Sequence, residues 1–238
     1  PEKMILPIPI GYSRGGFIWT DLVELPHLVI AGYVGSGKTN ALHQIIPALT
    51  RTKRAQVKLY IIDLKKVEFG YMREHAEIAM ALPDALRIFE TLALEMVYRM
   101  DLLLKARKNN IKLVKDLPYI VLIIDELSQL SPSLAKDSDT KNMRNMAHQY
   151  LTDIICLARA LGIHVILSTQ RPDKDILPGQ LKANIPAALC FQVKNSKNSE
   201  IVLDHGRASN LPPIAGRAIW QFDVEREVQV QHLPVELA

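Results

Sequence analysis

The sequence contains no long uninterrupted run of hydrophobic residues. No apolar stretch reaches the roughly 18 residues by which a membrane-spanning helix is recognised, and there is no signal-peptide pattern. The first residue is Pro1 and not methionine, so we expect the chain to be part of a longer protein. We therefore expect a cytoplasmic domain, and any membrane anchor of its parent protein would lie in a segment outside these residues.

Cysteine is scarce as well. Cys156 and Cys190 lie among apolar residues without metal-ligand spacing, which argues against a zinc site. We expect both thiols to be buried and reduced, as in a cytosolic protein. His164 alternates with apolar residues in a strand-like run and has no Cys or His at ligand spacing, so a histidine in the core is a simpler interpretation than a catalytic one.

The remaining composition is that of an ordinary globular domain. Apolar residues make up 48% of the 238 residues, which is enough for a substantial core. There is no internal repeat or low-complexity tract, and the polar run 195–199 predicts a loop. The net charge of +4 permits a nucleic acid or an acidic membrane as a partner without requiring either.

A phosphate-binding loop is the clearest motif in the chain. An apolar run leads into it and a helix-like stretch follows it, and its residues are Gly32-Tyr33-Val34-Gly35-Ser36-Gly37-Lys38-Thr39. Gly35 and Gly37 let backbone N–H groups converge on phosphate oxygens at the positive end of the following helix. Lys38 would reach the β- and γ-phosphates, and the Thr39 hydroxyl would ligate Mg²⁺. We predict that a nucleoside triphosphate binds through Gly32, Gly35, Ser36, Gly37, Lys38 and Thr39.

Two adjacent acids, Asp125 and Glu126, follow the apolar run 119–124. A buried strand that ends in acids is typical of the second half of a nucleotide-hydrolysing site. Asp125 can hold Mg²⁺ or its hydration shell, and Glu126 can orient and deprotonate the attacking water. Acids are also common where a strand simply ends in solvent, but the phosphate loop upstream favours the catalytic interpretation.

Apolar strands alternate with helical periods through the middle of the chain, which predicts an α/β fold with a mainly parallel central sheet flanked by helices. We expect an antiparallel edge hairpin near the C-terminus, with its turn near 223–227. Residues 1–27 predict a lead-in with a short hairpin that covers the sheet, and 28–238 predict a single P-loop ATPase domain. The predicted strands are 57–63, 119–124, 163–170, 187–193, 217–222 and 228–231, and the predicted helices are 84–107 and 142–161.

The order of these motifs resembles that of the FtsK/SpoIIIE group of hexameric motor ATPases, within the wider FtsK–HerA class. The resemblance covers about residues 26–220. The phosphate loop and Asp125-Glu126-Leu127 are shared with many other NTPases. The three most specific segments are Arg159-Ala160-Leu161-Gly162-Ile163-His164, Thr169-Gln170-Arg171-Pro172 and Lys182-Ala183-Asn184-Ile185-Pro186.

The resemblance implies a RecA-like P-loop fold, ATP and Mg²⁺ as cofactors, and roles for further residues. Gln170 would sense the γ-phosphate, and Arg159 would be an arginine finger that reaches the nucleotide of a neighbouring subunit. An active site completed by the neighbour implies a homo-hexameric ring. Arg171 and Lys182 occupy the places from which related motors contact double-stranded DNA in the central channel.

The cargo is left open by two departures from the pattern of DNA motors. Ala188 stands where those motors often have arginine, and Glu200 falls where they have a basic residue. The segment 211–220 looks most like conjugative DNA transfer ATPases. Arg171, Lys182 and the net charge of +4 favour DNA as the cargo. The alternatives are a type VII secretion ATPase that moves secreted protein substrates, and a nucleotide-binding module that switches without turnover.

Overall fold

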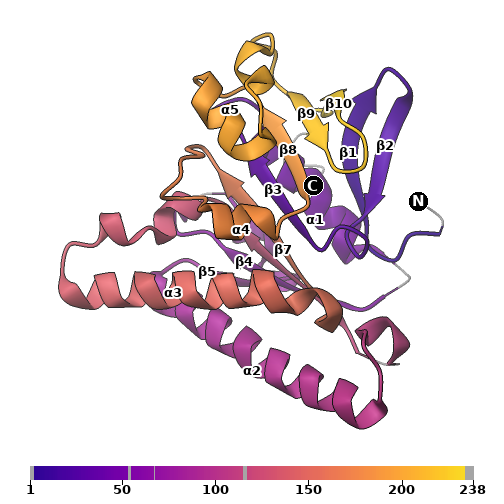
Figure 1. The fold of residues 1–238 in the computed structure, drawn as a ribbon, viewed down its shortest axis with the longest axis vertical. Coiled ribbons are helices and arrows are strands. Elements are labelled where there is room, and N and C mark those ends of the chain that lie inside the picture. Colours follow the sequence, from indigo (N-terminus) through magenta and orange to yellow (C-terminus); the bar gives the residue numbers. More distant parts are fainter. Residues whose placement is uncertain (1–2, 53–54, 67, 115–116, 234–238) are drawn as a thin grey trace. The chain divides into compact units, whose positions relative to one another are not determined.

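The computed structural model describes residues 3–52, 55–66, 68–114 and 117–233 (Figure 1). The chain divides into two compact units. The first unit combines Pro1–Ala55 with Ile166–Ala238, and the second unit is Gln56–Val165. Strand β7 (Ile163–Thr169) begins in the second unit and ends in the first.

The first unit has a parallel core and an antiparallel edge. Its helices and strands are β1 (Pro7–Ser13), β2 (Gly16–Asp21), β3 (His27–Ala31), α1 (Lys38–Thr50), α4 (Gly179–Ala183), β8 (Ala187–Phe191), α5 (Ser196–Leu203), η6 (Arg207–Asn210), β9 (Arg217–Gln221) and β10 (Arg226–Gln229). β3 and β8 run parallel, and all their residues are buried, as expected of strands covered on both faces. β9 pairs antiparallel with β8, and β10 pairs antiparallel with β9, which confirms the predicted edge hairpin.

The N-terminal hairpin of β1 and β2 extends this antiparallel edge. We expected the hairpin to cover the sheet, but Tyr12 of β1 pairs with Gln229 of β10. The physical reason is that β10 would otherwise present an unpaired row of backbone N–H and C=O groups. The first and last strands of the sequence are therefore neighbours.

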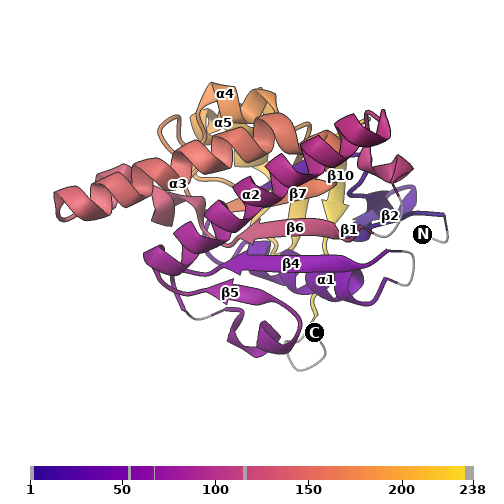
Figure 2. The same ribbon diagram turned by 90° about the horizontal axis from the view of Figure 1, so that it is seen from below.

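The second unit is built on parallel strands with two long helices. Its elements are β4 (Val57–Ile62), η1 (Gly70–Glu74), β5 (Glu77–Ala79), α2 (Leu82–Ala106), η2 (Ile111–Leu113), β6 (Tyr119–Ile124), η3 (Leu127–Leu130), η4 (Pro132–Leu134), α3 (Ser138–Leu157) and η5 (Ala158–Leu161). β4 lies between β5 and β6 and runs parallel to both. α2 and α3 run side by side along one face of these strands (Figure 2). α2 has Pro83 in its first turn, and its C-cap is Arg107, whose φ is 51°.

A buried arginine ties α2 to the segment that follows α3. Arg99 is fully buried, and its Nε donates to a carboxylate oxygen of Glu95 at 2.7 Å. Its two terminal nitrogens donate to the carbonyl oxygens of Leu161, at 2.7 Å, and Pro118, at 2.8 Å. The guanidinium therefore holds the end of η5 and the start of β6 against α2, because its planar fork can serve separate acceptors at once.

Three local expectations are wrong or need adjustment. The polar run 195–199 is not a loop but the start of α5, whose N-cap is Asn195. Cys156 is exposed, because it lies on the outer side of α3, whereas Cys190 is buried as expected and burial raises its pKa to about 12. The last strand begins at Arg226, two residues before its predicted start.

The histidine predicted to lie in the core does so. His164 is buried, and its ring stacks on that of Tyr119 at a centroid distance of 5.9 Å. None of the helices in the described part of the chain is both long and apolar enough to cross a bilayer. The parallel strands and antiparallel edge confirm the predicted α/β fold class.

Candidate nucleotide-binding site

The phosphate loop connects β3 to α1 in the first unit. Gly37, the N-cap of α1, has a φ of 117°, and Gly35 has a φ of 81°. Both angles lie in the left-handed region that favours glycine. A Cβ on Gly37 would also come within 3.0 Å of the Gly216 nitrogen and of the Phe191 ring. The loop therefore requires glycine at 37 both for its backbone angle and for close packing.

The loop interior is arranged as expected of a site for phosphate. Lys38 is only 5% exposed, and its Nζ donates to the carbonyl oxygen of Tyr33 at 3.1 Å, so the loop curls around the ammonium group. The Ser36 hydroxyl is buried without a hydrogen-bond partner among the described residues. Thr39 is half-buried in the first turn of α1, which contains no acidic residue. These features fit a bound phosphate group.

Gln170 lies beside the phosphate loop in the first unit. The amide of Gly32 donates to the carbonyl oxygen of Thr169 at 3.3 Å, which sets the end of β7 against the start of the loop. Gln170 follows Thr169 directly and is half-buried. Arg171, the next residue, is exposed, and its amide donates to the Thr169 hydroxyl at 3.1 Å. The structure therefore places the predicted γ-phosphate sensor next to the loop.

C-terminal residues support the phosphate loop, a role that the sequence analysis did not predict. The Gly216 amide donates to the Ser36 carbonyl oxygen at 2.8 Å, and the Val230 amide donates to the Gly216 carbonyl oxygen at 2.8 Å. Farther along α1, the amide of Leu233 donates to the Asn40 side-chain oxygen at 2.8 Å. The contacts to Ser36 and Asn40 join residues 180 and 193 positions apart, so no local sequence pattern could have indicated them.

The second unit carries the two predicted acids at the end of β6. The amide of Asp125 donates to the Ile62 carbonyl oxygen at 3.1 Å, and its side chain is largely buried. Burial raises the pKa of Asp125 to about 6, the Lys65 ammonium opposes this shift, and nearby carboxylates, first among them Asp63, add to it. Asp125 is thus costly to ionise in the absence of a cation.

Glu126 is held by two side chains of the same unit. One of its carboxylate oxygens accepts from the Ser128 hydroxyl at 2.8 Å and from the Ser128 amide at 3.3 Å. The other oxygen lies 3.4 Å from the Lys65 ammonium. Glu126 also caps η3, whose first residue follows it directly. The carboxylate is therefore oriented by its surroundings, as a residue that positions water must be.

Asp63 is an important acid to which the sequence analysis assigned no role. It is fully buried, and its carboxylate accepts from the amides of Lys66 at 2.9 Å, Glu68 at 3.1 Å and Phe69 at 3.3 Å. This acid shapes the loop after β4, in which Lys66 has a φ of 64°. It thereby fixes the backbone from which Lys65 reaches Glu126.

The donors for a metal ion are few. Among the residues that the structure describes, no group of three or more His, Cys, Asp or Glu side chains could hold a metal by itself. Mg²⁺ is usually bound by one or two protein oxygens together with substrate phosphates and water. Thr39 and Asp125 are donors of this type.

Arg159 is exposed in η5, just after α3. No carboxylate of the described residues forms an ion pair with it. The carbonyl oxygen of Leu161, at the other end of η5, is the one held by Arg99. Arg159 is thus presented to solvent from an anchored turn, as an arginine finger requires.

The predicted DNA contact Lys182 is partly neutralised. It lies in α4, and its ammonium is 3.4 Å from the carboxylate of Asp204. It lines an open hollow of about 860 Å³ to which Lys174, Lys197 and Glu200 also contribute. Of the two departures from the pattern of DNA motors, Ala188 is buried in β8, whereas Glu200 faces this hollow.

Comparisons with known proteins agree with this arrangement. The family model described as FtsK/SpoIIIE family matches residues 1–116. The DNA translocase FtsK of Chlamydia muridarum is 34% identical, over 88% of this chain and 28% of that protein. The chain is therefore similar in sequence to the FtsK/SpoIIIE family. It spans less than a third of the length of these FtsK relatives; for Tropheryma whipplei FtsK, 33% identical, the share is 30%.

Solved structures resemble the chain over nearly its full length. The pCW3 conjugation coupling protein TcpA, in its monomer form with ATPgS, matches with a TM-score of 0.91 and 29% identity over 98% of this chain and 68% of that one. The cytoplasmic domain of the type VII secretion ATPase EccC of Thermomonospora curvata matches with a TM-score of 0.79 and 22% identity, over 96% of this chain and 29% of that one. The second likeness concerns the fold alone. The predicted P-loop ATPase fold is thereby confirmed.

Proposed function

We propose that the chain is the motor domain of an ATP-driven DNA translocase that acts as a homo-hexameric ring. The observation that carries the proposal is the glycine-built phosphate loop around Lys38, in a chain homologous to DNA translocases and similar over its length to a conjugation coupling protein. The lower identity to the secretion ATPase makes protein cargo the second candidate. We propose further that both units work as one ATPase domain in the cytoplasm.

ATP binding is assigned to the phosphate loop. The amides of Gly35, Ser36 and Gly37 would donate to the phosphate oxygens, and the buried Lys38 would leave the Tyr33 carbonyl for the β- and γ-phosphates. Thr39 and Asp125 would hold Mg²⁺, which neutralises charge on the phosphates when it is bound. Because Asp125 must be ionised to act as a ligand, its raised pKa would oppose Mg²⁺ binding below about pH 6.

Hydrolysis is assigned to Glu126, Gln170 and Arg159. Glu126 would accept a proton from the attacking water, and Gln170 would contact the γ-phosphate through its amide. Arg159 would stabilise the charge that develops on the transferred phosphoryl group of a neighbouring subunit. The exposure of Arg159 and the anchoring of η5 by Arg99 support an action on another chain.

An action in trans can be tested by mixing two inactive variants. Lys38→Ala removes the nucleotide site and Arg159→Ala removes the finger, so each variant alone should hydrolyse ATP poorly. A mixed ring contains some interfaces in which an intact loop faces an intact finger. We expect the mixture to recover part of the ATPase rate, and a mixture no faster than its components would contradict the finger.

The proposed cargo is double-stranded DNA, contacted by Arg171 and Lys182. The decisive assay is the ATPase rate with and without duplex DNA at low salt, where phosphate contacts are strongest. We expect stimulation by DNA that is lost in Arg171→Ala and Lys182→Ala. If DNA does not change the ATPase rate of the unmodified chain, and the chain binds a peptide with a helical export signal, the secretion function is favoured instead.

A further inference from the structure

A second basic hollow lies beside β10, at the residues that pair with Ile219 and Trp220 of β9. It measures about 400 Å³ and is lined by residues of the β1–β2 turn, η6 and β10. β9 begins directly after Gly216, whose amide donates to the phosphate loop. It pairs antiparallel with β8, so that its last residue, Gln221, lies opposite Ala188 near the start of β8. The hollow is separate from the phosphate loop, although its Glu227 lies 4.0 Å from Arg217, the residue after Gly216.

Positive charge dominates this hollow. Three arginines, Arg14, Arg207 and Arg226, line it together with a single acid, Glu227. Arg207 is engaged, because it pairs with Glu225 and lies 3.8 Å from Glu227. Neither Arg14 nor Arg226 forms an ion pair within the described part of the chain. Two guanidinium groups therefore remain available for an external anion.

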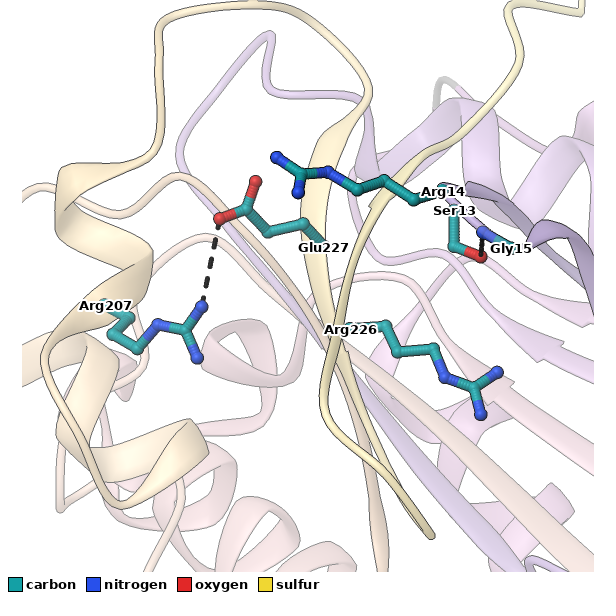
Figure 3. A pocket seen from close by; sticks show the side chains of 6 residues that line it. All are labelled: Ser13, Arg14, Gly15, Arg207, Arg226 and Glu227. Carbon is teal, nitrogen blue, oxygen red and sulfur yellow. Dashed lines mark hydrogen bonds and ion pairs between the residues drawn. The ribbon is translucent and has the colours of Figure 1, made fainter.

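The arginines come from three separate elements, as Figure 3 shows. Arg207 and Glu227 face each other, and Arg14 reaches from the hairpin turn toward the same carboxylate. Arg226 extends from β10 in another direction, so the basic surface continues around the strand. Planar guanidinium groups match the oxygens of a phosphate and bind them in bidentate fashion.

A second observation favours a polymer over a small anion. The hollow to which Lys182 contributes extends along the whole of α5. Asp204 is the last residue in the sequence that lines it, and Arg207 follows only three residues later. The eight residues of α5 span about 12 Å, which corresponds to three or four base pairs of a duplex. A ligand with regularly repeated phosphates could therefore occupy both hollows.

We propose that the hollow lined by Arg14, Arg207 and Arg226 binds the phosphate backbone of DNA. It forms a contact site separate from the predicted channel residues Arg171 and Lys182. The identity of the polymer rests on the proposed function, whereas the preference for phosphate rests on the arginines themselves. The contact is with the backbone, so it carries no sequence preference.

The test is the salt dependence of DNA binding by the 238-residue chain. Each phosphate contact contributes about 0.9 to the slope of log K against log salt. Arg14→Ala should lower the magnitude of this slope by about 0.9, and the affinity at 0.1 M salt by about eightfold. The double variant with Arg226→Ala should lose up to about 1.8 in slope and about 60-fold in affinity.

A matched control removes the same charge elsewhere. Arg87→Ala on the exposed face of α2 should leave the slope unchanged, and thermal melting checks that all variants are folded. A double variant with the slope of Arg87→Ala would overturn the proposal while leaving the motor function intact. A second contrary result is also possible. Inorganic phosphate would raise the melting temperature of the parent but not of the double variant, while the salt slope of DNA binding is the same in both. This result would assign the hollow to a free anion and would also overturn the proposal. A parent that does not bind DNA would overturn both proposals.

Discussion

Replacing Arg99 by methionine tests how the predicted finger is anchored. Methionine fills similar space but leaves the carbonyl oxygens of Leu161 and Pro118 without the donors at 2.7 and 2.8 Å. Each unsatisfied buried acceptor costs about 1–3 kcal/mol. Because methionine avoids the desolvation of a buried guanidinium, part of this cost is offset. We therefore expect a net loss of about 2–4 kcal/mol in the free energy of unfolding.

Thermal unfolding followed by circular dichroism measures this loss. For a chain of this size 1 kcal/mol corresponds to about 2–4 °C, so the Tm of Arg99→Met should fall by roughly 4–16 °C. Arg99→Lys should lie between the parent and Arg99→Met, since one ammonium cannot reproduce the fork. The exposed control Arg87→Ala, on the same helix, should melt within about 1–2 °C of the parent. An Arg99→Met variant as stable as this control would refute the anchoring role of Arg99.

Three further predictions concern the nucleotide site. Glu126→Gln should still bind ATP but hydrolyse it about 10²–10⁴-fold more slowly, as single-turnover kinetics would show; unchanged turnover would exclude Glu126 as the base. Gly216→Ala places a Cβ 2.6 Å from a backbone oxygen, at a residue whose φ is 86°, so this variant should have a lower Tm and weaker nucleotide binding. The control Gly70→Ala adds a Cβ with no contact closer than 3.6 Å and should change neither the Tm nor nucleotide binding. The pKa of Asp125 is about 6 in the folded chain and 3.8 ordinarily. Between about pH 4 and pH 6 the folded chain therefore keeps a proton that the unfolded chain has lost, so the free energy of unfolding falls as the pH rises through this range. Asp125→Asn should therefore raise the Tm at pH 8 by removing a cost of up to about 3 kcal/mol, and leave it unchanged at pH 4; an equal effect at both pH values would contradict the raised pKa.

Local chemistry made much of the fold and site predictable. The spacing of Gly35, Gly37 and Lys38 indicated the phosphate loop, and the apolar runs before Asp125 and Gln170 indicated the buried strands. In each case the deciding residues lie within about ten positions of one another. Such patterns can be read without knowing which strands become neighbours.

The features that were missed depend on long-range pairing or on a helix face. Nothing near Tyr12 indicates that β1 pairs with β10, and nothing near Gly216 indicates its hydrogen bond to Ser36. The start of α5 was mistaken for a loop because its residues are polar. One of them, Asn195, caps the helix, since its side-chain oxygen accepts from the Asn198 amide. Cys156 was expected to be buried because its neighbours are apolar, but its side of α3 faces solvent.

The most direct test of a DNA motor is displacement of a third strand from duplex DNA. A chain that moves along the duplex should release a bound triplex-forming strand in the presence of ATP and Mg²⁺, and Glu126→Gln should not. ATP-dependent release by the parent alone is the predicted result. Rapid ATP hydrolysis in the presence of DNA with no strand release would contradict translocation.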